Sequence, residues 1–244
     1  MKKIVKRFKN IEALSLAAVK YTAALANAEI KKKGYFTIAL SGGTTVISYY
    51  NALAKMKMPW NKTYIFWQDD RYVKYGDKDS NVKLVFYNLI SRVKMSYDMI
   101  YPAPSNISPA AKAAKIYELL IRQLFKRLQP GNTMPSYDLV VAGMGPDGHT
   151  ASLFPGDKKA LKEKKALIIS VKAPRYAVVK DRITMTLPFI NNSKNVLFLT
   201  EEKGRKEVLE KVLKGDKKYP SALIKAKKDL IWFITQTGGY YGKR

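Results

Sequence analysis

The stretch YDLVVAGMGPDGHTASLFP, residues 137–155, joins an apolar run to a loop that is rich in glycine and proline. Its first part, 137–144, has the length and the valine-rich composition of a strand buried on both faces. Two further glycines and two prolines follow, together with His149, the only histidine of the chain. In open α/β sheets, ligands bind where loops leave the carboxyl ends of the strands. The stretch therefore predicts a buried strand that ends at a functional site.

Apolar runs of similar length recur along the chain and alternate with amphipathic segments. The runs predicted as strands are 35–40, 63–68, 137–144, 166–171, 182–187, 195–200 and 229–235. The segments predicted as helices are 11–33, a stretch through Tyr49 and Leu53, 81–90, 110–128 and 204–214. Short apolar strands with helical crossovers predict an α/β fold whose largely parallel sheet is covered on both faces. We expect a single domain over residues 1–244.

Two predicted helices have a regular apolar face. The face of 110–128 is predicted from four residues at steps of four, Ile116, Leu120, Leu124 and Leu128. The face of 11–33 is predicted from Ile11, Leu14, Ala18, Tyr21, Leu25 and Ala28. The basic start of the chain imitates a signal peptide, but Glu12 and Lys20 interrupt the apolar part. We therefore expect a cytoplasmic protein whose first helix belongs to the fold.

Composition excludes several kinds of site. The chain has no cysteine and one histidine, so disulfides, thiolate nucleophiles and zinc sites built from cysteine or several histidines are excluded. Nothing in the sequence requires a metal. No apolar run reaches the length of about eighteen residues that a membrane helix needs, so we expect no membrane partner.

The formal charge of +26 comes from 45 lysines and arginines against 19 aspartates and glutamates. Such a charge favours anionic ligands. The basic residues run through the whole chain, and there is no zinc-finger spacing, RNP-type aromatic motif or glycine–arginine repeat. We therefore expect no specific nucleic-acid partner.

The first predicted strand leads into LSGGTTV, residues 40–46. Glycines after a strand let the backbone approach a ligand, and the N-terminus of the next helix favours an anion. The segment lacks the lysine of a P-loop and the spacing of a dinucleotide fingerprint, so a phosphate monoester suits it better than ATP or NAD. A glycine turn with a helix cap explains the pattern equally well. Its candidate phosphate-binding residues are Ser41, Gly42, Gly43, Thr44 and Thr45.

The second predicted strand leads into WQDDRYV, residues 67–73. Two carboxylates and an arginine after a buried strand are costly unless they pair or meet a ligand. Asp69 and Arg71 are therefore candidate site residues, and an Asp–Arg ion pair that holds a loop together is the alternative. The downstream DSN, residues 79–81, has the pattern of a helix cap.

His149 lies just past the strand 137–144, with Asp147 two residues before it. We expect His149 near the start of a short helix that Pro155 ends, where the helix dipole disfavours imidazolium. A neighbouring carboxylate can hold one ring nitrogen and direct the other outward. The pattern favours a general base, and a structural histidine is the alternative. Ser152 is a rival nucleophile, but HTASLF lacks the glycine-flanked elbow of a hydrolase serine.

Taken together, these segments resemble the 6-phosphogluconolactonase family. LSGGTT looks like its phosphate loop, and DDRYV followed by DSN looks like its Asp-Glu-Arg-x-Val and Ser-Asn segment. DLVVAGMGPDGHTASLFP is similar to the family signature almost residue for residue. RITMTLPFINNSKNVLFLT, GRK and YPSALI follow in the family's order, so the resemblance spans nearly the whole chain.

The resemblance implies a three-layer, Rossmann-like α/β fold, shared with glucosamine-6-phosphate deaminase and ribose-5-phosphate isomerase. It also implies hydrolysis of 6-phosphoglucono-δ-lactone to 6-phosphogluconate in the oxidative pentose phosphate pathway, without a cofactor. The chain departs from the family pattern at three points. Asp70 replaces a glutamate, a histidine often found before DSN is absent, and Lys203 stands where a glycine is common.

For this reaction we hypothesise a specific role for each candidate residue. His149, oriented by Asp147, is expected to activate the water that attacks the lactone carbonyl, and Arg71 to stabilise the resulting negative charge. The 6-phosphate is expected on residues 42–45, with charge from Lys206 and Arg182. Asp69 is expected among the substrate-binding residues.

Two other functions share this fold. A deaminase-like sugar-phosphate isomerase should carry an acidic residue a few positions after the histidine, and the chain offers none before Asp157. A sugar-phosphate sensor of a transcription regulator should carry a separate DNA-binding domain, for which 244 residues leave no room. We expect a small-molecule enzyme that is a monomer or a homodimer.

Overall fold

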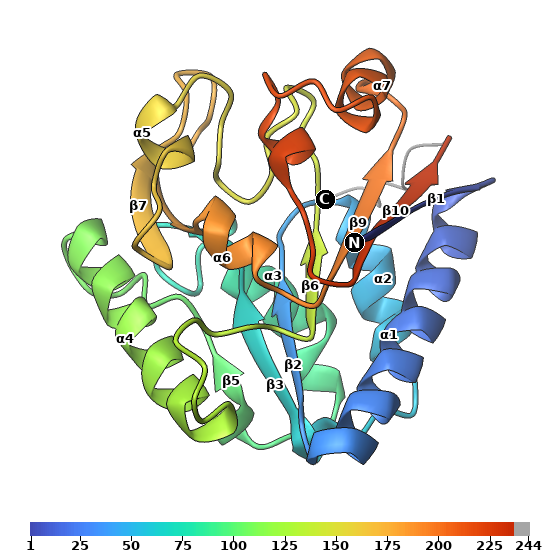
Figure 1. Cartoon of the computed structure of the whole chain (residues 1–244), viewed down its shortest axis with the longest axis vertical. Helices are drawn as coiled ribbons and strands as arrows, with labels where there is room; N and C mark the ends of the chain where they lie inside the picture. The colour runs from blue at the N-terminus through green and yellow to red at the C-terminus, as the bar shows by residue number, and fades with distance from the viewer. Residues whose placement is uncertain (237–244) are drawn as a thin grey trace.

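The computed structural model of the chain describes residues 1–236 and builds them around a seven-stranded parallel sheet (Figure 1). In spatial order its strands are β1 (Lys2–Phe8), β10 (Asp229–Thr235), β9 (Asn195–Glu201), β6 (Leu139–Ala142), β2 (Phe36–Leu40), β3 (Thr63–Trp67) and β5 (Ile100–Tyr101). A second, antiparallel sheet contains β4 (Asp69–Arg71), β8 (Asp181–Met185) and β7 (Ile168–Lys172). Parallel pairing directs the carboxyl ends of the seven strands to one edge of the main sheet.

Helices cover both faces of the main sheet, so the expected α/β class with three layers is confirmed. The helices of the described chain are α1 (Ile11–Lys33), α2 (Thr45–Leu53), α3 (Asn81–Asn88), α4 (Ala110–Leu128), α5 (Lys158–Leu161), α6 (Leu187–Asn191) and α7 (Lys206–Leu213). Short 3-10 turns lie at Trp60–Lys62, Ile90–Arg92, Tyr97–Met99 and Pro220–Leu223. Within residues 1–236, no helix combines the length and the apolar character needed to cross a bilayer.

Alternate side chains of the strands build two cores. On β10, Ile231 and Phe233 join the core under α1, α2 and α3, whereas Leu230 and Trp232 join the core under α4 and the second sheet. Because side chains alternate between faces, a strand buried on both faces needs apolar residues throughout. This is why the strands could be recognised as continuous apolar runs. The single-domain expectation extends over 1–244, and its last eight residues lie outside the described chain.

The N-terminal residues form a strand that the sequence analysis did not predict. β1 pairs with β10 in parallel, from Lys2 opposite Asp229 to Phe8 opposite Thr235. Ile4 and Phe8 are its partly buried side chains, and its other residues, among them three lysines, are exposed. Lysine is a common protection of edge strands against further pairing. The same lysines hid the alternation and made the segment resemble a leader peptide.

Two further predictions need correction. The segments 166–171 and 182–187 are strands, but they form an antiparallel hairpin in the second sheet instead of joining the main sheet. On α4 the predicted face is wrong at Leu120, which is 41% exposed, and the buried face runs through Tyr117, Ile121 and Leu124. Four-residue steps overshoot the 3.6-residue turn, so a row of such steps winds away from the core.

The buried carboxylate of Asp138 holds several elements together at the amino-terminal end of β6. Asp138 has no exposed surface, and Lys33 and Lys194 approach its carboxylate at 2.7 and 2.9 Å. The backbone N–H and the hydroxyl of Thr37 also donate to it, at 2.9 and 3.0 Å. These bonds tie α1, β2 and the residues before β6 and β9 together.

We expect Asp138→Asn to lower the free energy of unfolding by about 3 kcal/mol, because it leaves two lysines without their shared carboxylate. Urea denaturation followed by circular dichroism measures this. Glu207→Gln is the matched control, since it removes the carboxylate of an exposed pair with Lys211, and it should change the stability very little. Equal effects of the two substitutions would contradict the importance of the buried network.

Candidate active site

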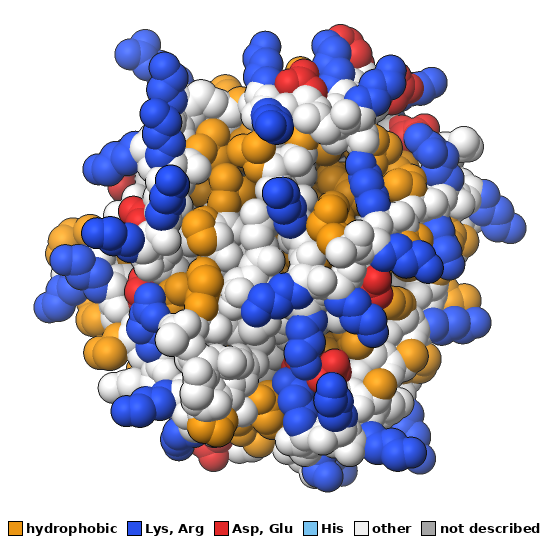
Figure 2. Space-filling view, viewed as in Figure 1, with side chains coloured by type: hydrophobic (Ala, Val, Ile, Leu, Met, Phe, Trp, Pro, Cys, Tyr) orange, Lys and Arg blue, Asp and Glu red, His pale blue; other side chains and the backbone are white. Residues whose placement is uncertain are grey.

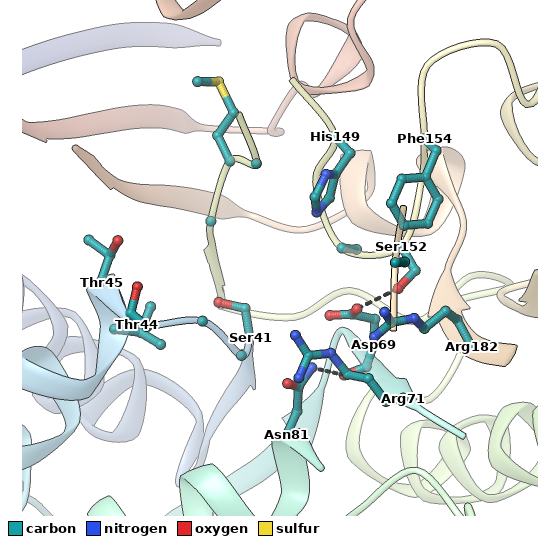
Figure 3. Close-up of a pocket in the computed structure, with 18 of the residues that line it drawn as sticks. Ser41, Thr44, Thr45, Asp69, Arg71, Asn81, His149, Ser152, Phe154 and Arg182 are labelled. Carbon is teal, nitrogen blue, oxygen red and sulfur yellow. Dashed lines mark hydrogen bonds between the residues drawn. The ribbon is translucent and has the colours of Figure 1, made fainter. Parts of the chain in front are cut away.

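A pocket of about 270 Å³ opens at the carboxyl ends of the parallel strands. Its walls come from the loops after β2, β6 and β9, from β4 and β8, and from the loop between β7 and β8. The lining side chains used below are Ser41, Gly42, Gly43, Thr44, Thr45, Asp69, Arg71, Asn81, His149, Ser152, Phe154, Tyr176, Arg182 and Arg205. Figure 3 shows Thr44 and Thr45 at one end of the pocket and the arginines at the other. Most of the residues predicted from three separate segments therefore meet in one place.

The loop after β2 is shaped for close approach. A Cβ atom on Gly42 would lie 1.8 Å from the side-chain oxygen of Asn81, so only glycine fits there. Gly43 has a φ of 108°, which also favours glycine. Thr44 caps α2 without a side-chain bond to the first turn. The backbone N–H groups at this helix start thus remain available to an anion.

Two arginines lie side by side on the antiparallel strands β4 and β8, where Arg71 is opposite Arg182. Arg71 donates from Nη1 to the carbonyl of Asp79 at 2.7 Å. Arg182 is only 8% exposed, and its Nε has no partner among the described residues. Burial, and then the charge of Arg71, lower the pKa of Arg182. Two such cations with unused donors provide a strong site for an anion or a developing oxyanion.

The two aspartates of this segment have other partners than Arg71. Asp69 accepts a hydrogen bond from the Ser152 hydroxyl at 2.6 Å. Asp70 accepts the backbone N–H groups of Arg71 and Asn81, both at 2.7 Å. No ion pair in the described chain joins either aspartate to Arg71, so the alternative of an Asp–Arg pair that closes the loop is wrong. Ser80 caps α3 as DSN predicted, with its hydroxyl accepting from Lys83 N at 3.2 Å.

Asp70 is fully buried beneath the pocket. Burial raises the pKa of Asp70 to about 7, against the opposing effect of the hydrogen bond from Asn81 N. The shorter side chain at this position therefore serves the first turn of α3, and through it the placement of Asn81. Asn81 is a pocket residue that the sequence analysis treated only as part of a cap.

The segment after β6 forms a tight turn, and the short helix expected at His149 is absent. Gly148 has a φ of 79° and Ala151 a φ of 49°, neither of which fits a right-handed helix. The backbone N–H of Gly145 donates to the carbonyl of His149 at 2.9 Å. A Cβ on Gly145 would lie 2.2 Å from the imidazole ring, so glycine is required there. A helix dipole thus plays no part at His149.

Asp147 fixes the imidazole instead. Its Oδ1 lies 2.5 Å from Nδ1 of His149 and also accepts the His149 backbone N–H at 3.2 Å. Partial burial would raise the pKa of Asp147, but the hydrogen bonds from His149 and Tyr176 lower it to about 2. An ionised carboxylate at Nδ1 holds the proton on that nitrogen and leaves Nε2 as the acceptor. Phe154 packs against the ring, with centroids 4.8 Å apart.

Ser152 does not have the setting of an activated nucleophile. It is buried, and its hydroxyl donates to Asp69 and not to His149. Its backbone N–H bonds to the hydroxyl of Thr184 at 3.1 Å, which fixes the turn against β8. Its contacts therefore assign Ser152 to the orientation of Asp69.

The cation supplied by the α7 region differs from the predicted one. Lys206 is exposed and does not line the pocket, whereas the preceding Arg205 does. Arg205 lies 3.2 Å from Glu201, and its Nε is buried without a hydrogen-bond partner in the described chain. The segment GRK offers two adjacent cations, and the direction of the helix start decides which of them faces the pocket. Tyr176 was missed because its loop carries no motif.

The fold and this pocket define a class of protein: an α/β protein whose pocket at the strand ends suits a small anionic ligand and contains a histidine held by a carboxylate. A family model described as glucosamine-6-phosphate isomerases/6-phosphogluconolactonase matches residues 9–232, and the chain belongs to this family. The resemblance found in the sequence is thereby confirmed.

Individual relatives agree with this assignment. Probable 6-phosphogluconolactonase 4 of Arabidopsis thaliana is 37% identical over 96% of this chain and 92% of its own. The 6-phosphogluconolactonase of Nostoc sp. is 34% identical, with 98% of each chain covered. The crystal structure of 6-phosphogluconolactonase from Thermotoga maritima superimposes with a TM-score of 0.85 at 28% identity, covering 96% of this chain and 100% of that one.

The raised pKa of Asp70 predicts the pH dependence of stability. Between the pKa of an unfolded aspartate and about 7, the native state binds more protons than the unfolded state, so stability falls as pH rises. The loss is a few kcal/mol, about 1.4 kcal/mol per pH unit across that interval. Asp70→Asn should flatten the decline in the free energy of unfolding between pH 5 and 8. His149→Gln is the control, because it removes the only imidazole that could also titrate in this range. If the slope of the free energy of unfolding against pH were unchanged in Asp70→Asn, a protonated Asp70 in the native state would be contradicted.

Proposed function

We propose that the chain hydrolyses 6-phosphoglucono-δ-lactone to 6-phosphogluconate, the lactonase step of the oxidative pentose phosphate pathway. The observation that carries the proposal is the 2.5 Å contact between Asp147 and His149 at a pocket that also holds a glycine loop and two adjacent arginines. Relatives that bear the name 6-phosphogluconolactonase match nearly the whole chain, which supports the same activity here.

His149 acts as the general base. Its Nε2 removes a proton from water while the water oxygen bonds to the lactone carbonyl carbon, and the imidazolium that forms is stabilised by Asp147. When the tetrahedral intermediate collapses, the bond from the carbonyl carbon to the ring oxygen breaks. The imidazolium returns its proton to that ring oxygen, which becomes a hydroxyl, and the new acid ionises. Proton transfer of this kind contributes about 10²–10⁴-fold to the rate.

The reaction involves two negatively charged groups, the oxyanion of the intermediate and the phosphate of the substrate, and different cations of the pocket serve each. Arg71 and Arg182 stand beside Asp69 opposite His149 (Figure 3), so we assign both to the oxyanion of the intermediate. The phosphate then rests on residues 42–45 at the start of α2. Because α2 packs against β9, Arg205, which follows β9, supplies the cation there, and Lys206 lies outside the pocket.

Several expectations stay predictions. They are the monomeric or homodimeric state, the cytoplasmic location, the absence of a specific nucleic-acid partner and the independence from cofactors. On the face shown in Figure 2, lysine and arginine side chains are spread widely among few carboxylates. This distribution gives a general attraction for anionic substrates instead of one patch shaped for a polyanion.

We expect His149→Gln to lower kcat by about 10²-fold or more, because the amide cannot take a proton from water. Lactone made in place from glucose-6-phosphate is the substrate, spontaneous opening is subtracted, and circular dichroism confirms folding. Asp147→Asn should lower kcat in the same direction. Undiminished activity of His149→Gln would keep the lactonase and remove the base. A folded wild type without activity would favour the sugar-phosphate sensor or the deaminase-like isomerase, tested by glucosamine-6-phosphate binding and turnover.

Adjacent residues provide a matched test of the phosphate site. We expect Arg205→Ala to raise KM for the lactone about tenfold or more, because a charged hydrogen bond to phosphate is lost. Lys206→Ala removes the same charge one residue later and should leave KM within about twofold. The reverse ranking would restore Lys206 as the phosphate ligand.

A further inference from the structure

Tyr176 contacts the Asp147–His149 pair from a loop outside the three segments that the sequence analysis singled out. It lies in the loop 173–180 between β7 and β8, and it lines the pocket. Its hydroxyl donates a hydrogen bond to Oδ2 of Asp147. Oδ1 of the same carboxylate faces Nδ1 of His149 at 2.5 Å. Asp147 is therefore held from both oxygens, by the imidazole on one side and by the phenol on the other.

The loop that carries Tyr176 is fixed independently of this bond. The backbone N–H of Ala173 donates to the carbonyl of Lys180 at 2.7 Å and closes the hairpin. The ammonium group of Lys180 then donates to the carbonyls of Pro174, Arg175 and Ala177, at 2.5 Å in the case of Arg175. Lys180 thus joins three carbonyls of the same loop. These bonds fix the conformation of the loop, so that Tyr176 lies at the pocket.

Burial of the Tyr176 ring contributes little to the stability of the fold. The residue is 68% exposed, so its ring adds little to the apolar core. Its hydroxyl nevertheless bonds to a carboxylate whose side chain is only 26% exposed. Partial burial and the bond to Asp147 raise the pKa of Tyr176 to about 12, so the phenol stays a donor throughout the neutral range.

We propose that Tyr176 is a positioning residue for the hydrolysis proposed above: its hydroxyl locks the Asp147 carboxylate so that Oδ1 remains on Nδ1 of His149. Without the phenol, Oδ2 is open to water, and the carboxylate can rotate about its Cβ–Cγ bond away from the ring. The imidazole then loses its fixed tautomer for part of the time. Tyr176 acts through Asp147, and the step it supports is the proton transfer at Nε2.

Tyr176→Phe tests this assignment, because it removes the hydroxyl and keeps the ring. We expect kcat to fall about three- to tenfold with KM nearly unchanged, as for one lost hydrogen bond that serves orientation. Val178→Ala is the matched control in the same loop, because Val178 is 88% exposed and does not line the pocket. It should keep both constants. An unchanged kcat in Tyr176→Phe, or a rise in KM alone, would overturn the proposal.

A second measurement separates this inference from the proposed reaction. The chain has one histidine, so the ring nitrogens of ¹⁵N-labelled protein give a single imidazole signal set by NMR. We expect the wild type and Val178→Ala to hold the Nδ1–H tautomer, and Tyr176→Phe to show a smaller share of it. This change would stand even if the wild type hydrolysed no lactone, in which case only the reaction would be refuted. Equal tautomer shares in Tyr176→Phe and wild type would refute the positioning role.

Discussion

Parallel pairing of β6 with β2 on one side and β9 on the other is the constraint on which the site depends. Because of this pairing, the loop after β2 with Gly42 and Gly43, the turn that carries His149 and the start of α7 all lie at the same edge of the sheet. The buried carboxylate of Asp138 fixes the opposite end of β6 through Lys33 and Lys194. With one end of the strand held by ion pairs and its faces held by two cores, the loop at the other end can adopt a strained turn. The positive φ of Ala151 lies in that turn.

The second sheet supplies what the parallel sheet alone would lack. β4 and β8 run antiparallel, so Arg71 and Arg182 become direct neighbours across the pair. Two adjacent guanidinium groups repel each other, and burial adds to the cost for Arg182. That cost is offset when an anion enters between them. The arrangement therefore favours an anion, or a developing negative charge, between the two guanidinium groups.

The sequence predicted the α/β class, most strands and the three segments that line the pocket, because each feature is local. A buried strand is a continuous apolar run, and a strand-end loop needs glycine. Prediction from sequence failed where the structure of a segment depends on contacts with a distant part of the chain. The lysines of β1 hid an edge strand whose partner, β10, lies at the other end of the chain. Arg205 and Lys206 are adjacent in sequence, and only the direction of the helix start decides which cation reaches the pocket. Tyr176 acquires its role solely from contact with Asp147.

Two aspartates near the pocket have pKa values that their surroundings shift in opposite directions. Asp147 is partly exposed and accepts from an imidazole and a phenol, and its pKa falls to about 2. Asp70 lies beneath the same pocket, and burial outweighs its backbone donors so that its pKa rises to about 7. Divergent values in one site indicate separate tasks. The permanently ionised group can stabilise an imidazolium, whereas the group that keeps its proton near neutrality adds little negative charge beside Arg71. The raised pKa of Asp70 thus reduces the negative charge near the arginine pair, which favours an anion in the pocket.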